Sequence, residues 1–398
     1  MGDLKTNGEI WQRNGAQNKL MGEQYDKNDK FDKISNKNSS ANLKTIALIF
    51  VSLLLDLLAF TMILPLLPSL LDYYDKQEGH GTSLYGSLLG AVQSFQKLTG
   101  APEKFSSVLF GGALGSMYSF LQFLTSPIVG SLSDAYGRKP MLLICLIGIA
   151  LSHALWGVAS SFSVFVLARF IGGLSKANVS LSMAVVTDAS NEKTRARGMA
   201  LVGLAFSIGF IVGPCAGAWF AVTNDESYGL WGQRPAFYAL SLSLANVALV
   251  AFCVPESLPK DKRAPLSFTL AKTVDYISPW HLLRFTAVKN LSEHQNKVLS
   301  KLGLIYFLYL FIYSGLEFTI TFLTHHTFNY TAMQQGKMFL VIATAFAVSC
   351  MTSMAASQAP GAARGAVLGA LRSLGALARA AGPLLASAGS VQLLQQRE

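Results

Sequence analysis

The sequence predicts an all-α membrane protein that crosses the bilayer many times. Hydrophobic side chains make up 51% of its 398 residues and charged side chains only 14%, against roughly 25% charged in an average soluble domain. The charged residues crowd into positions 1–44 and 255–301, which leaves long stretches almost free of charge. A helix of about 20 apolar residues is long enough to cross the hydrocarbon core. This composition excludes most soluble enzymes.

Nine apolar runs have this length, and each is expected to form a membrane-spanning helix. Six of them form a compact first half, and three follow a polar segment. The runs occupy positions 45–71, 106–130, 140–160, 163–187, 198–221, 235–254, 301–324, 336–356 and 366–388.

Polar segments divide the chain into four parts. Residues 1–44 are rich in Asn, Ser and Gln and lack an apolar run, so they are expected to be a disordered tail. Residues 45–254 form the six-helix N-terminal half, and residues 255–300 are a central loop. Residues 301–398 hold an incomplete C-terminal half.

The Lys and Arg residues predict the sidedness of a multi-pass membrane protein. If the N-terminus is cytosolic, the segments on that side hold 22 Lys and Arg residues, and those on the opposite side hold 6. Basic residues are enriched in cytosolic loops. We therefore expect a cytosolic tail and a cytosolic central loop, whereas the choice between the plasma membrane and an internal membrane stays open.

A short loop between the second and third runs carries the most specific motif. It contains Gly130, Asp134, Gly137, Arg138 and Lys139. Glycines permit a tight turn between two helices, and an acid suits the partial positive charge of a helix N-terminus. The spacing resembles the signature loop of the major facilitator superfamily. The resemblance implies a transporter fold with two halves, in which this loop serves gating.

Two further motifs follow in the order that this family would show. Asp56 precedes Pro65 and Pro68 in the first run, which looks like the first-helix motif of the drug:proton antiporter branch. Arg169 in the fourth run, followed by two glycines, resembles the buried-arginine motif of the superfamily.

The fifth run contains Gly209, Gly213, Pro214 and Gly217, which resembles the antiporter motif, although Ala218 replaces its final glycine. Small residues four apart let helices approach closely, and a proline permits a bend. A hinge and ordinary close packing both fit this pattern. Over residues 45–350 the sequence looks like the animal tetracycline transporter-like proteins. That resemblance implies proton- or ion-coupled movement of amphipathic organic solutes.

Ionised residues inside a membrane are costly, by roughly 2.5–3.5 kcal/mol at the centre of a helix, so each one is a functional candidate. Four of the six candidates are basic, and the two basic pairs are each seven residues apart, which places each pair on one helical face. The six are Asp56, Arg169, Lys176, Glu317, Arg372 and Arg379.

Our first hypothesis is that these basic residues attract an organic anion. Asp56 or Glu317 would then take up a proton and couple its movement to transport. The alternative is structural, with Asp56 paired to Arg169 and Glu317 paired to an arginine. His325 and the neighbouring histidine, at the outer end of a helix, are candidate pH sensors.

The second half is short. Residues 363–383 resemble residues 196–214, as expected if the two halves are parallel repeats. In the family, the fifth helix of the second half carries this pattern. The last apolar run therefore corresponds to span eleven, and spans nine, ten and twelve are expected to be missing.

An incomplete half leads to a second hypothesis. The chain is then a truncated, transport-inactive form that acts as an interaction or dominant-negative partner, and a second copy covers its exposed helix faces. Enzymatic activity, metal ligands, cofactors and nucleic-acid binding are not indicated, since no nucleophile with a base, metal-ligand spacing or phosphate-binding loop is present.

Overall fold

The computed structural model describes residues 42–78, 83–99, 106–222, 233–263, 278–285, 291–331, 334–335, 338, 346–358 and 364–395. All regular elements in these ranges are helical. The chain divides into two compact units, Met1–Ala47 and Leu48–Glu398. In the first unit only residues 42–47 are described, and they are helical. The predicted disordered tail therefore lies almost entirely outside the described residues.

Residues 48–253 of this unit are mainly helical. Residues 48–61 are helical, and the helix ends before Pro65, which lacks the N–H that a helix interior requires. The elements that follow are η1 (Leu64–Leu66), α2 (Leu67–Glu78), α3 (Leu84–Thr99), α4 (Ser106–Tyr136), α5 (Arg138–Gly157), α6 (Phe162–Ser175), α7 (Asn178–Asp188), α8 (Glu192–Val222) and α9 (Gln233–Cys253).

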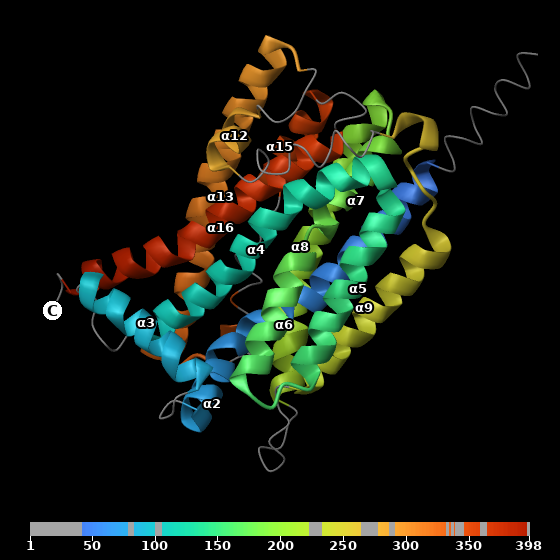
Figure 1. Cartoon of the computed structure of the whole chain (residues 1–398). Helices are drawn as coiled ribbons and strands as arrows, with labels where there is room; N and C mark the ends of the chain where they lie inside the picture. Colours follow the sequence, from blue (N-terminus) through green and yellow to red (C-terminus); the bar gives the residue numbers. More distant parts are fainter. Residues whose placement is uncertain are drawn as a thin grey trace, which may run out of the picture. The chain divides into compact units, whose positions relative to one another are not determined.

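The remaining elements form the central segment and the second half (Figure 1). They are η4 (Lys260–Lys262), α12 (Pro279–Arg284), α13 (Glu293–Phe328), α15 (Phe346–Gln358) and α16 (Arg364–Gln395).

The fourth predicted run is not one helix. It divides into α6 and α7 because Lys176 has ψ 17° and acts as the C-cap of α6, donating its N–H to Gly173 O. A helix terminus leaves carbonyl groups without intrahelical partners. Here the Gln122 side chain of α4 donates its Nε2–H to Lys176 O at 3.1 Å. The Lys176 carbonyl at the break therefore has a hydrogen-bond partner from a neighbouring helix.

The predicted central loop, residues 255–300, ends earlier than expected. Helix α13 begins at Glu293 because Ser292 and Gln295 form a capping box, in which each side chain accepts a hydrogen bond from the other residue's N–H. The apolar pattern missed this first turn because its side chains are polar. A helix that starts in water and continues into the membrane changes composition along its length.

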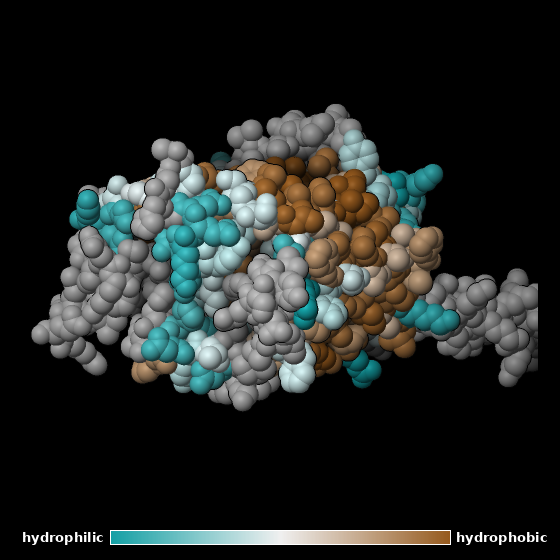
Figure 2. All heavy atoms as spheres, turned by 90° about the horizontal axis from the view of Figure 1, so that it is seen from below, coloured by the Kyte–Doolittle hydropathy of each residue, from teal (hydrophilic) through white to brown (hydrophobic). Residues whose placement is uncertain are grey.

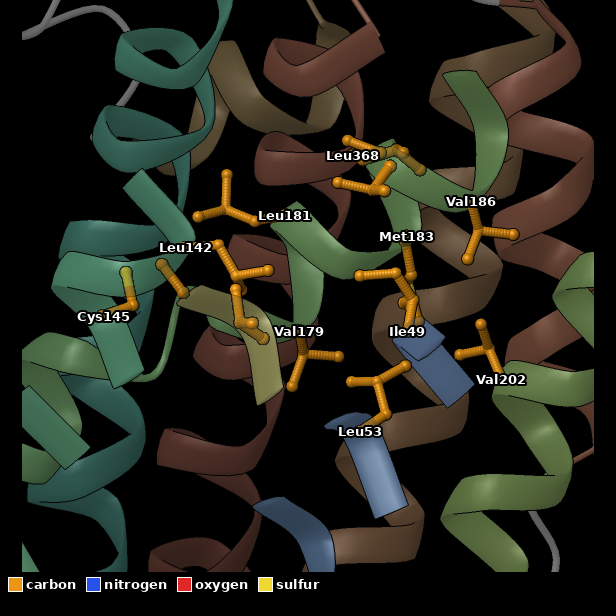
Figure 3. Close-up of a cluster of buried hydrophobic side chains, with 14 of the residues drawn as sticks. Ile49, Leu53, Leu142, Cys145, Val179, Leu181, Met183, Val186, Val202 and Leu368 are labelled. Atoms are coloured by element: carbon orange, nitrogen blue, oxygen red, sulfur yellow. The ribbon is translucent and has the colours of Figure 1, made fainter. Parts of the chain in front are cut away.

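The core of the first half gathers apolar side chains from several helices (Figure 3). Leu53 of the first helix, Leu142 of α5, Leu181 of α7 and Val202 of α8 are buried there. Leu368 of α16 is fully buried in the same cluster. The last apolar segment therefore packs into the core of the first half.

Helix α16 runs alongside α4 and α13 (Figure 1). Ser373 donates a hydrogen bond to Phe123 O of α4 at 2.6 Å. Small residues permit this approach, since a side chain at Gly369 would meet the backbone of Ser126 and Pro127. This contact joins the second half to the first.

Six helical segments in the described residues are long and apolar enough to cross a membrane. Large apolar side chains are exposed, such as Ile144 on α5, Phe252 on α9 and Ile312 on α13, and hydrophobic residues cover a continuous part of one face in Figure 2. The six are Asn42–Glu78, Arg138–Gly157, Phe162–Asp188, Arg197–Phe220, Gln233–Cys253 and Glu293–Leu316. The count of nine spans stays a prediction.

Candidate functional site

A cavity of about 180 Å³ lies among the first helix, α4, α6, α8, α13 and α16. Its walls are mainly apolar and aromatic. Phe206 and Phe210 of α8 stack with their rings 16° apart, and Tyr309 and Tyr313 of α13 stack with theirs 8° apart. Flat aromatic walls with few polar groups suit the apolar part of an organic molecule.

Four basic residues predicted from the sequence line this cavity together: Arg169, Lys176, Arg372 and Arg379. Three of them are more than nine-tenths buried, and Arg379 is partly exposed. Glu317 lies on α13, but its side chain falls outside the described residues. The fold therefore brings residues more than 200 positions apart into one site.

Asp56 forms an ion pair with Lys176. The distance from Lys176 Nζ to Asp56 Oδ2 is 2.8 Å, and both side chains are at most 5% exposed. Lys176 Nζ also lies 4.5 Å from the centre of the Phe60 ring. The pair of Asp56 with Arg169 that the structural alternative requires is not formed, because the break between α6 and α7 brings Lys176 to the acid instead.

Arg169 is surrounded by aromatic rings. Its Cζ lies 5.8 Å from the ring centres of Tyr118 and Phe165 and 5.7 Å from that of Trp156. Its buried Nε has no hydrogen-bond partner, and no described carboxylate lies within ion-pair distance of Arg169. Aromatic faces attract a cation without neutralising it. Arg169 therefore offers uncompensated positive charge to the cavity.

Each of the two arginines of α16 contacts an uncharged side chain. Arg372 Nη1 lies 3.3 Å from Tyr306 Oη, and its Cζ lies 5.5 Å from the centre of the Phe206 ring. Arg379 Nη2 donates to Gln122 Oε1 at 2.7 Å. Gln122 and Tyr306 were not predicted as site residues, because an uncharged side chain in an apolar run does not reveal that it has a polar partner.

The signature loop forms a compact network of charged groups. Arg138 is fully buried, with Nη1 2.6 Å from Asp134 Oδ1 and Nε 3.0 Å from Asp188 Oδ2 of α7. Glu256 accepts hydrogen bonds from the backbone N–H of Arg138 at 2.9 Å and of Lys139 at 3.3 Å. An acid at this point satisfies N–H groups that a helix N-terminus leaves open.

Gly137 is required at the turn between α4 and α5. Its φ of 112° is a conformation that other residues rarely adopt, and a side chain would meet Glu256 and Arg263. Lys139 Nζ donates to Ala251 O at 2.8 Å. The loop was predicted from the sequence, but its acidic partners Asp188 of α7 and Glu256 after α9 were not.

The glycines of the fifth run face the first helix. Gly209 and Gly213 lie against Leu57 and Thr61, and Thr61 Oγ1 donates to Gly209 O at 2.8 Å. Gly217 lies against the Met62 carbonyl. Pro214 lies inside α8. The close packing that the sequence indicated is present.

Comparisons with known proteins place these features in a family. Residues 49–353 match the Major Facilitator Superfamily. This chain belongs to that superfamily. It is 38% identical to the human protein named Major facilitator superfamily domain-containing protein 10, over 86% of this chain and 87% of the relative. The Bos taurus protein of the same name is 39% identical, over 86% of each chain.

Solved structures agree with this membership. The crystal structure of the human organic anion transporter MFSD10 (TETRAN) is 37% identical in sequence, with a TM-score of 0.77 over 88% of this chain and 94% of that one. A D-xylose-proton symporter shares the fold at 14% identity, with a TM-score of 0.52 over 87% of this chain and 90% of the symporter. The chain is therefore a multi-pass membrane protein of a transporter family, and its relatives are transporters rather than enzymes.

Major facilitator proteins contain parallel repeats, and corresponding contacts occur in both halves here. The sequence echo matches Gly213 to Gly382 and Gly209 to Ala378. Thr61 Oγ1 donates to Gly209 O at 2.8 Å, and Ser314 Oγ donates to Ala378 O at 3.5 Å. A side chain at Gly382 would meet Ser314, as one at Gly213 would meet Thr61. Helices α13 and α16 thus repeat the packing of the first helix and α8.

Proposed function

We propose that this chain is a secondary active transporter of amphipathic organic anions or drugs. The cargo binds in the aromatic cavity, and a proton moves with it or against it during alternating access. The cargo carries a carboxylate or a similar anionic group and a flat apolar body. The cavity needs no metal or cofactor for this task.

The observation that carries the proposal is the group of basic residues in the cavity, above all Arg169. Four basic residues line it, and Asp56, paired with Lys176, is the acid described beside them. Arg169 in particular has rings around it and no described acid at ion-pair distance. A buried cation without a counter-charge is costly. An anionic cargo supplies the missing charge, so its binding is favoured there.

The lining and a relative support an organic cargo. Phe206, Phe210, Tyr309 and Tyr313 provide stacked rings on two sides of the cavity. The human protein with 37% identity is an organic anion transporter. Arg372 lies over the Phe206 ring, so a cargo that stacks on the ring lies close to a guanidinium.

Proton coupling follows from the Asp56–Lys176 pair. An anionic group that approaches Lys176 competes with Asp56 for the ammonium group. Asp56, left without its counter-charge in a buried place, then favours its protonated form. Binding of cargo and binding of a proton are thereby linked, and the linkage is reciprocal.

The test measures accumulation of a fluorescent organic carboxylate in proteoliposomes under an imposed pH gradient. Arg169→Ala is expected to weaken transport about tenfold or more, because it removes a charge-assisted contact. Asp56→Asn is expected to remove the dependence on the gradient. The matched control is Arg284→Ala, since Arg284 lies on α12 outside the cavity lining and stacks on Trp280.

The neutral methyl ester of the same dye is a second control and should show no effect of Arg169→Ala. Wild-type accumulation that both cavity variants reproduce would contradict the proposal. A chain that moves no dye under any gradient would favour the transport-inactive form instead.

We also propose roles for the two motifs outside the cavity. The loop residues Gly130, Asp134, Gly137, Arg138 and Lys139 form a gating loop. Arg138 supports this role because it ties α4 and α5 to α7 through two acids. Gly209, Gly213, Pro214 and Gly217 form an antiporter-like hinge, and their direct contact with the first helix supports it.

The chain's topology completes the proposal. It has nine spans, a cytosolic N-terminus and a cytosolic central loop, with residues 45–254 as the complete half and residues 301–398 as the shortened half. The alignment with the human relative supports a shorter chain: it extends over 410 positions but uses 86% of 398 residues, about 342, so about 68 positions of the relative have no counterpart here.

A second copy of the chain covers the face that the absent spans would occupy. Leu304, Leu308, Ile312 and Leu316 recur every four residues along α13, and each is about half exposed or more. They form one apolar stripe. Mass measurement in lipid nanodiscs checks this association, and a single copy at all concentrations would contradict it.

A further inference from the structure

Gln122 occupies an unusual position in the cavity wall. It lies on α4, is 4% exposed, and contacts both halves of the molecule. Its Oε1 accepts a hydrogen bond from Arg379 of α16 at 2.7 Å, and its Nε2 donates one to Lys176 O at 3.1 Å. Neither the motifs nor the charge pattern indicates this residue.

The two partners explain why the side chain is an amide. Arginine can only donate, and a backbone carbonyl can only accept. A side chain between them therefore needs one acceptor and one donor at the same end. A glutamine supplies both without a net charge. The two contacts also fix which end of the amide faces which partner.

The amide connects Arg379 to the ion pair. Lys176 provides the carbonyl that Gln122 holds, and the same residue provides the ammonium that binds Asp56 at 2.8 Å. Lys176 is also the C-cap of α6, at the break before α7. A displacement of Gln122 therefore acts on a residue whose backbone is not fixed by a continuous helix.

Other charged and titratable groups surround this connection. They lie on α4, α5, α6 and α16. Tyr118 and Cys145 interact electrostatically with Asp56, and His153, Arg169 and Arg372 interact with Lys176. Arg379 interacts with Tyr118.

We propose that Gln122 is a positioning residue that couples anion binding at Arg379 to protonation of Asp56. This inference rests on the proposed transport of an organic anion. When the anion takes the Arg379 guanidinium, Gln122 Oε1 loses its donor, and the amide turns away from Lys176 O. The Lys176 segment is then released, and Asp56 loses its partner and takes up a proton.

The experiment separates coupling from transport as such. Proteoliposomes receive the fluorescent carboxylate in two assays: equilibration down its own gradient, and accumulation against its gradient driven by a pH difference. Gln122→Leu is expected to lower the ratio of accumulation to equilibration by about tenfold or more, the scale expected for a hydrogen bond to a charged group. The control is Gln77→Leu, on the exposed side of α2.

Gln122→Glu gives a rescue that a purely structural role would not produce. Its protonated carboxyl has one donor and one acceptor, as the amide has, whereas its carboxylate opposes the Lys176 carbonyl. Accumulation by this variant is expected in acid and is lost as pH rises, while the wild type changes less over the same range. Accumulation in acid and at higher pH is measured on one preparation of Gln122→Glu. The comparison is therefore independent of how well Gln122→Leu folds.

The outcomes are distinguishable. Wild-type protein that does not transport the dye contradicts the proposed function. Transport by the wild type together with unchanged accumulation by Gln122→Leu overturns the role of Gln122. An equal loss of equilibration and accumulation in Gln122→Leu, with no recovery of accumulation by Gln122→Glu in acid, also overturns this role. The residue then serves packing.

Discussion

Arg138 is the residue with the most charged contacts in the signature loop. It is fully buried, and it contacts Asp134, Asp188 and the Ser133 hydroxyl. Removing one partner of a buried ion pair leaves the others without a counter-charge, which costs about 3–5 kcal/mol. Arginine suits this place because its planar group donates in several directions at once.

Arg138→Ala is expected to lower the free energy of unfolding by about 3–5 kcal/mol, because Asp134 and Asp188 lose their buried counter-charge. Arg138→Lys is expected to lower the free energy of unfolding by less, since lysine keeps the charge but lacks the several donors of arginine. Thermal unfolding in detergent measures both. Lys139→Gln is the control, because the Lys139 side chain donates to a backbone carbonyl and has no described acid as a partner. Equal melting temperatures for all three variants would contradict the network.

Charged residues of the candidate cavity could be predicted from the sequence, and neutral ones could not. Asp56, Arg169, Lys176, Arg372 and Arg379 stand out because a charge is costly in an apolar segment, and the four basic ones line the cavity. Gln122 is an ordinary polar residue in a long helix until its two partners are located in space. The choice of Lys176 over Arg169 as partner of Asp56 depends on the helix break, which the apolar pattern does not reveal.

At the scale of helices, the contact between α8 and the first helix depends on the absence of side chains. A Cβ at Gly217 would meet the Met62 carbonyl, which is backbone and cannot rotate away. Gly90 on α3 has open space around it. Both glycines lie within helices, but only Gly217 lies where a side chain would meet a neighbouring helix.

Gly217→Ala is expected to lower the free energy of unfolding by about 1–3 kcal/mol, because overpacking forces the two helices apart. Gly90→Ala is expected to be neutral or to raise it by up to about 1 kcal/mol, since alanine is the better helix former. Melting temperatures of the two variants test this pair. A loss of stability at Gly90 equal to that at Gly217 would argue against the close approach.

A second contact between elements depends on pH. His325 of α13 has Nε2 3.2 Å from Asp72 Oδ2 of α2 and Nδ1 3.1 Å from Tyr330 O. Both nitrogens face acceptors, and the imidazolium donates from both. The hydrogen bond with Asp72, the largest cause, raises the pKa of His325 above its ordinary value of 6.5.

Because the pKa is raised in this conformation, the contact contributes its full stability below pH 6.5 and loses it as the pH rises through the raised pKa. His325→Gln should therefore lower the melting temperature in acid and have little effect in alkaline solution. Melting curves over this pH range measure the difference, with Asp72→Asn as a companion variant. An effect that is constant with pH would contradict the protonated contact.

For the whole molecule, helix α16 joins the two halves. It packs against α4 through Ser373 and contributes Leu368 to the core of the first half. It also brings Arg372 and Arg379 into the cavity. Helix α16 therefore supplies two of the basic residues that the proposed function requires.

The proposed count of nine spans places the two ends of the chain on opposite sides of the membrane. In intact cells, an epitope tag at the C-terminus is expected to be accessible from outside, whereas a tag at the N-terminus is accessible only after permeabilisation. A tag inserted in residues 79–82 is the positive control, because these residues follow the first proposed span and would lie on the outer side if the N-terminus is cytosolic. Protection of both terminal tags would indicate an even number of spans.

The superfamily, most of the long apolar helices and the charged residues of the candidate site could be predicted from the sequence alone. Length, apolarity and the cost of buried charge are properties of each segment alone, so they can be recognised without its neighbours. Only the tertiary structure decided which groups meet: Lys176 with Asp56, Gln122 with Arg379, and Glu256 with the turn at Gly137. These contacts join residues from different helices, and no local pattern records how helices distant in sequence pack together.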